Sequence, residues 1–71
     1  MKEYLVIYER EGNIWSAYVP DLPGCVAAGD TREEVARLIR EAVEFHIEGM
    51  HAEGIPIPEP RAEAERVNVA A

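Results

Sequence analysis

Few side chains in this 71-residue sequence have the type and spacing that catalysis needs. Cys25 has no histidine near it in the sequence, and a nucleophilic cysteine needs a base. Asp21 and Asp30 are two isolated carboxylates, whereas a two-metal nuclease needs several around its ions. His46 lies in the middle of an apolar helical pattern. We therefore predict no catalytic residue, no metal site, no cofactor and no enzymatic activity.

Each of these side chains has a structural explanation. Asp21, between Pro20 and Leu22, can accept hydrogen bonds from turn amides, and Asp30 precedes a helix start, where negative charge is favourable. Cys25 follows a turn and is interpreted as a small buried apolar residue. His46 is interpreted as a core histidine. A degenerate nuclease is the third-ranked alternative.

The stretch from Tyr18 to Glu34 separates strand-forming residues from helix-forming ones. Pro20 and Pro23 fix φ and lack a backbone N–H, so a strand must end there. Gly24 and Gly29 can take a positive φ, which allows the chain to double back. Thr31-x-x-Glu34 predicts a capping box, with the hydroxyl accepting from the Glu34 amide and the carboxylate from the Thr31 amide. A helix should begin here.

The same residues carry a family resemblance. The run Pro20-Asp21-Leu22-Pro23-Gly24-Cys25, followed by Gly29-Asp30-Thr31 and Glu33-Glu34, resembles the signature of the HicB-like antitoxin domain. The segment Gly54 to Pro60 is similar to that family's exit segment, so the resemblance covers Tyr4 to Pro60. It implies a small sheet with one helix, like a cut-down ribonuclease H fold. It also implies a partner, a HicA-type RNA-cleaving toxin that family members bind and silence.

The order of elements predicts a two-layer α+β domain with an antiparallel sheet of three to four strands. Strands are expected at 4–8, 14–19 and 25–28, followed by one helix from Thr31 to about Glu53. Gly54 fits the C′ position of that helix. We expect one domain over 1–71, with a core at 2–54, a proline-rich exit at 55–60 and a tail at 61–71. Period-two valines give the tail a possible short strand at 65–69.

Apolar residues exceed what one small core can cover. We assign Leu5 and Ile7 of the first strand, with Ala17 and Val19 of the second, to the sheet face under the helix. Three tyrosines, Tyr4, Tyr8 and Tyr18, then fall on the other face, as a half-wetted sheet surface or as a protein-binding surface. The helix is longer than the sheet, which leaves Phe45, Ile47 and Met50 on its flanks or overhang. We therefore predict a homo-oligomer, a dimer or a tetramer.

Charge and composition narrow the function classes. Fourteen acidic and seven basic residues give a net charge of −7, which disfavours direct nucleic-acid binding and favours a basic partner protein. No apolar run approaches the roughly 20 residues of a membrane span, and the N-terminus does not resemble a secretion signal, so a cytoplasmic location without membrane contact is expected. The eleven residues after Pro60 offer no operator-binding motif of the kind many fuller family members carry.

The sequence thus predicts an antitoxin-type domain that neutralises a HicA-like mRNA-cleaving toxin by direct contact. The alternative is a stand-alone homo-oligomeric domain that binds a small molecule or another cytoplasmic protein.

Overall fold

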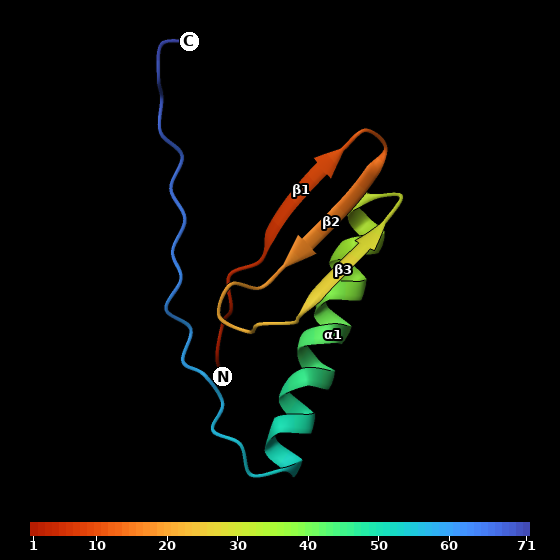
Figure 1. The fold of residues 1–71 in the computed structure, drawn as a ribbon, viewed down its shortest axis with the longest axis vertical. Coiled ribbons are helices and arrows are strands. Elements are labelled where there is room, and N and C mark those ends of the chain that lie inside the picture. The colour runs from red at the N-terminus through yellow and green to blue at the C-terminus, as the bar shows by residue number, and fades with distance from the viewer.

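A three-stranded antiparallel sheet with one long helix against one face makes up the folded part of the chain (Figure 1). The computed structural model describes every residue from Met1 to Ala71. Strands β1 (Ile7–Glu11), β2 (Ile14–Tyr18) and β3 (Val26–Gly29) lie in the order β1-β2-β3, and helix α1 spans Arg32–Ala52. The predicted α+β class and the β-β-β-α order are confirmed.

The hairpin of β1 and β2 closes through the two-residue loop Gly12-Asn13. Glu11 pairs with Ile14, and Gly12 has a φ of 62°. A glycine with positive φ at the first loop position matches a type II′ turn, whose twist suits two adjacent strands. The first strand was expected at 4–8, with 9–13 as the connection. It instead begins at Ile7 and takes in Glu9 to Glu11, charged residues that an edge strand tolerates in solvent.

The strand register shows that the face assigned to the first strand is wrong. Tyr8 pairs with Ala17, so the two side chains point to the same side, toward α1. The Arg32 guanidinium carbon, at the start of the helix, lies 4.1 Å from the centroid of the Tyr8 ring. Tyr4 also packs against the core from this side. Of the three tyrosines, only Tyr18 lies on the open face of the sheet.

The core contains six buried residues, from β2, the turn after it and the helix: Ala17, Val19, Leu22, Cys25, Val35 and Ile39. Leu22 and Val35 are 0% exposed. The expected core residues Leu5 and Ile7 are not among the six, because Ile7 pairs with Tyr18 on the face away from the helix. The turn between β2 and β3 therefore belongs to the core as much as the strands do.

Two consecutive turns explain how Leu22 becomes buried. The Leu22 N–H donates to the Val19 carbonyl at 3.1 Å across Pro20-Asp21, and the Cys25 N–H donates to the Leu22 carbonyl at 3.1 Å across Pro23-Gly24. Gly24 has a φ of 89°, as the third residue of a type II turn requires. Leu22 is the residue shared by both turns, and its side chain points inward.

The N-terminus of α1 is capped much as predicted. Thr31 Oγ1 accepts from the Glu34 N–H at 3.1 Å, and Glu34 Oε1 accepts from the N–H of Asp30 at 2.9 Å. The carboxylate thus reaches one residue further back than the expected Thr31 amide. Gly29 does not have a positive φ. A glycine is needed here because a Cβ would collide with Glu34 Oε1.

Replacing Gly29 with alanine is therefore expected to displace the Glu34 carboxylate and break its bond to Asp30. The loss should be about 0.5–1.5 kcal/mol, the range for one hydrogen bond. Gly49→Ala is the matched control, because Gly49 lies inside α1 and a Cβ there would have no atom within 4 Å. That change should stabilise by up to about 1 kcal/mol through helix propensity. Urea denaturation followed by circular dichroism separates the two, and equal shifts would contradict the packing argument.

The C-terminus of α1 ends in a Schellman motif. The Gly54 N–H donates to the His51 carbonyl at 3.2 Å, and the Ile55 N–H donates to the Met50 carbonyl at 2.9 Å. Gly54 has a φ of 69°, which confirms its predicted C′ position. Pro56 follows and cannot continue the helix.

The helix is longer than the sheet that it covers. Its 21 residues span about 32 Å at ~1.5 Å per residue. The strands have four or five residues, and the C-terminal part of α1 extends past them (Figure 1). Phe45 is 80% exposed, while Ile47 and Met50 are half-buried. The expected overhang is present, and Phe45 is its most exposed apolar side chain.

The chain after α1 is extended and forms no strand. The possible fourth strand at 65–69 is absent, since no residue after Gly54 belongs to the sheet. Val67 and Val69 are 72% and 76% exposed. Figure 1 shows this tail running away from the folded unit.

Candidate protein-binding surfaces

The turn after β2 holds the start of the tail, directly after the exit segment, against the folded unit. Asp21 Oδ2 accepts from the backbone N–H of Arg61 at 3.0 Å and from that of Ala62 at 2.9 Å. Asp21 was expected to bind amides of its own turn, but the two donors lie 40 and 41 residues further along the chain. This carboxylate therefore has a structural role in fixing where the tail leaves the domain.

The N-terminal segment makes two further contacts with the exit segment. The Tyr4 hydroxyl donates to the Pro58 carbonyl, and Lys2 Nζ lies 2.7 Å from Glu59 Oε1. The hydrogen bond with Glu59 raises the pKa of Lys2, and the same bond lowers the pKa of the Glu59 carboxyl. The pair thus persists above the lowered pKa of Glu59 and below the raised pKa of Lys2. Both side chains are exposed, so salt screens the attraction.

The predicted motif residues form two separate structures, the double turn after β2 and the N-terminal cap of α1. Pro20 to Cys25 form the double turn that buries Leu22 and anchors the tail through Asp21. Gly29, Asp30, Thr31 and Glu34 form the helix cap. Neither the burial of Leu22 nor the anchoring role of Lys2, Pro58 and Glu59 was predicted from the sequence. No local pattern could have revealed contacts between residues more than fifty positions apart.

The side chains considered for catalysis are buried, half-buried or have structural partners. Cys25 is 3% exposed, and burial raises the pKa of its thiol, which disfavours the thiolate. His46 is half-buried on α1, and Asp21 is occupied by tail amides. No group of three or more His, Cys, Asp or Glu side chains is arranged to hold a metal ion.

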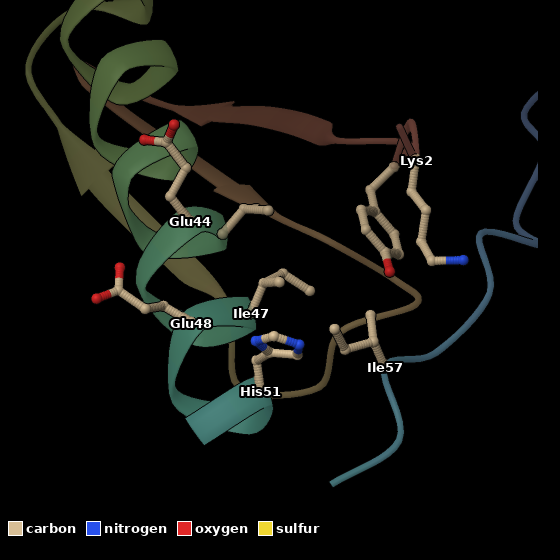
Figure 2. Close-up of a pocket in the computed structure, with 8 residues that line it drawn as sticks. Lys2, Glu44, Ile47, Glu48, His51 and Ile57 are labelled. Atoms are coloured by element: carbon tan, nitrogen blue, oxygen red, sulfur yellow. The ribbon is translucent and has the colours of Figure 1, made fainter. Parts of the chain in front are cut away.

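An open groove of about 530 Å³ lies between the C-terminal half of α1 and the exit segment. Tyr4, Ile47, His51 and Ile57 line it, and Figure 2 shows Ile47, His51 and Ile57 directed into it. Figure 2 also shows the carboxylates of Glu44 and Glu48 pointing away from the groove, into solvent. The interior of the groove is therefore mainly apolar.

The outer side of α1 carries both arginine and glutamate in its first half and mainly glutamate in its second half. Arg37 pairs with Glu41 at 3.6 Å. No lysine or arginine follows Arg40 in the helix. We call Glu44, Glu48 and Glu53 the acidic end of α1; all three are exposed. Their charge suits a basic partner.

The sheet face opposite the helix is uncovered. Ile14 is 51% exposed, Tyr18 40% and Val26 65%. These side chains share one face, because Tyr18 pairs with Val26 and Ile14 lies four residues before Tyr18 on β2. This face, the free sheet edges and the acidic end of α1 are the surfaces available to a partner. No helix of the structure is both long and apolar enough to cross a bilayer.

The arrangement defines a small α+β domain whose surfaces suit protein binding. Comparison with known proteins agrees: the sequence matches the HicB-like antitoxins of bacterial toxin-antitoxin systems over residues 4–70. The chain belongs to this HicB-like antitoxin family. Family membership confirms the non-enzymatic prediction.

Individual relatives extend this comparison. An uncharacterized 14.9 kDa protein from the rep-hol intergenic region of Haemophilus phage HP1 is 35% identical over 65 residues, which cover 92% of this chain and 49% of the phage protein. Antitoxin HicB 2 of Photorhabdus laumondii is 32% identical, over 86% of this chain and 45% of the antitoxin. The chain thus spans about half the length of these two relatives.

A solved structure has the same fold. One chain of a structure described as a HicA3 and HicB3 toxin-antitoxin complex superposes with a TM-score of 0.69 and 32% sequence identity. The match covers 84% of this chain and 70% of that chain. The HicB-like fold expected from the turn and cap residues is confirmed.

Proposed function

We propose that this chain is an antitoxin that neutralises a HicA-like, mRNA-cleaving toxin by direct contact. The observation that carries the proposal is the family match over residues 4–70, joined to a 32%-identical chain found in a HicA3 and HicB3 complex. Inhibition requires no chemistry from this chain. Since the target of such a toxin is mRNA, the proposed place of action is the cytoplasm.

The charge of the chain supports a basic, RNA-binding partner. A net charge of −7 attracts such a protein and speeds its association. The acidic end of α1 is the surface we assign to this attraction, because its carboxylates are exposed and no lysine or arginine follows Arg40 in the helix. The same charge disfavours direct contact with nucleic acid.

We also propose that the chain self-associates. Val26 and Phe45 expose apolar area that a monomer leaves in water, at a cost of about 25 cal/mol per Å². The alternative function, small-molecule binding by a stand-alone oligomer, would use the apolar groove beside Ile47 and Ile57.

Co-expression with the product of the adjacent reading frame tests the antitoxin proposal. That product alone is expected to arrest growth, and this chain is expected to restore growth and to co-purify with it. Folded Cys25→Ala, His46→Ala and Asp21→Asn variants should inhibit as well as the native chain, because none of these side chains does chemistry. The antitoxin proposal fails if the two products do not co-purify and this chain does not relieve the toxicity of the other product.

A further inference from the structure

The outer edge of β3 has unpaired backbone groups. The Val19 N–H donates to the Cys25 carbonyl at 3.2 Å, and the register continues with Ala17 opposite Ala27. In an antiparallel pair, successive residues alternate between directing their backbone groups at the partner strand and away from it. Cys25 and Ala27 thus face β2, which leaves the N–H and C=O of Val26 and Ala28 directed outward. These four groups form the free edge.

The two edges of the sheet differ in how they are protected. At the β1 edge, Tyr8 and Arg10 direct their backbone groups outward, and charged Glu9 and Glu11 flank them. Charged side chains discourage strand addition. The sequence of β3 is Val-Ala-Ala-Gly, which has no charge and no proline. Only the β3 edge is therefore open to pairing with another strand.

An apolar flank of α1 lies beside this edge. The helix packs on β3 and β2, and Figure 1 shows it running alongside β3. Ala36 and Val43 are on the flank toward β1, where they line a hollow with Tyr8. Leu38 and Phe45 are seven residues apart and lie on the opposite flank, toward the β3 edge. Phe45 is 80% exposed there.

We infer that two copies of this chain associate about a two-fold axis through β3, joining their sheets into one six-stranded sheet. Ala27 lies opposite Ala27 of the second copy, and Val26 lies opposite Ala28. This register uses all four outward backbone groups of each copy. The Leu38 and Phe45 flanks of the two helices then face each other on the same side of the joined sheet.

Symmetry and area favour a second copy as the occupant. In a two-fold interface, each surface patch contacts the same patch of the second copy. The β3 edge and the apolar flank of α1 are side by side in one chain, so they can contact the β3 edge and the flank of the second copy at the same time. A four-residue strand pair alone falls short of the roughly 1,200–2,000 Å² that stable interfaces bury. Two phenylalanines, at about 150–250 Å² each, and two leucines supply much of the remainder.

Hydrogen exchange in the native protein tests this pairing. The amides of Val26 and Ala28 are expected to exchange at least about tenfold more slowly than those of Tyr8 and Arg10, which face outward on the other edge. Light scattering should give twice the monomer mass of 7.9 kDa. A dimer in which all four amides exchange equally fast would overturn the β3 interface but leave self-association standing. A 7.9 kDa mass would overturn both, and neither result bears on toxin binding.

Two proline variants give a matched test. Ala28→Pro removes an outward N–H that no bond within the chain uses, and Arg10→Pro does the same on the β1 edge. With folding verified by circular dichroism, Ala28→Pro is expected to be monomeric and Arg10→Pro dimeric. A folded Ala28→Pro dimer contradicts the pairing. If the Val67 and Val69 amides were protected from hydrogen exchange together with the Val26 amide, the tail of a second copy would occupy the edge. That result would also contradict pairing between the two β3 strands.

Discussion

Leu22→Ala is expected to lower the free energy of unfolding by about 2–5 kcal/mol, the range for removing a fully buried leucine. Leu22 is 0% exposed and sits where two turns meet, so backbone hydrogen bonds on both sides limit how far the site can collapse. A domain of this size has a stability near the low end of roughly 5–15 kcal/mol, and the variant should be partly unfolded at 37 °C. Urea denaturation followed by circular dichroism measures the change.

Ile14→Ala serves as the control for Leu22→Ala. Ile14 is a similar aliphatic residue, but it is 51% exposed on the open sheet face. Its truncation should cost less than about 1 kcal/mol. If the two variants had the same denaturation midpoint, the turn would not be part of the core.

Reversing the charge at the acidic end of α1 should slow toxin binding by about 10–100-fold at low ionic strength. The variant carries Glu44→Lys, Glu48→Lys and Glu53→Lys. Each reversal adds two charges, so the net charge rises from −7 to −1. Lysines near a helix C-terminus also interact favourably with its dipole, so the fold should be preserved. Stopped-flow measurement of association with the co-purified toxin gives the rate.

A second triple variant separates local from global charge. Glu9→Lys, Glu63→Lys and Glu65→Lys reach the same net charge from exposed positions on β1 and the tail. This control should bind faster than the helix variant, and added salt should reduce the difference. Equal rates for the two variants would show that only the total charge matters, and the acidic end of α1 would lose its assigned role.

Local chemistry made much of this fold predictable from sequence. Proline, glycine and threonine restrict the backbone within a few residues, so the turn after the second strand, the helix start at Thr31 and the helix end at Gly54 could be located to within a residue or two. The helix interior followed from the spacing of Val35, Ile39 and their neighbours. These features depend on contacts between residues at most five positions apart.

The features that the sequence could not supply depend on distant contacts. Both faces of the first strand are apolar, so alternation alone could not show that Tyr8 rather than Ile7 faces the helix; the register with Ala17 decides it. The anchoring of the tail by Asp21 joins residues forty positions apart. Leu22 is flanked by proline and aspartate, a context typical of an exposed loop.

The ion pair between Lys2 and Glu59, at 2.7 Å, brings the two ends of the folded unit together. The polypeptide from Lys2 to Glu59 is therefore nearly a closed ring. Asp21 also holds Arg61 and Ala62 against it, and residues 63–71 are the appendage. In such a ring, the position of the chain break matters little to the contacts that stabilise it. A permuted chain opened in the Gly12-Asn13 loop and joined across Lys2 and Glu59 would keep the same core. The order of residues along the chain is thus less essential to this fold than their arrangement around the ring.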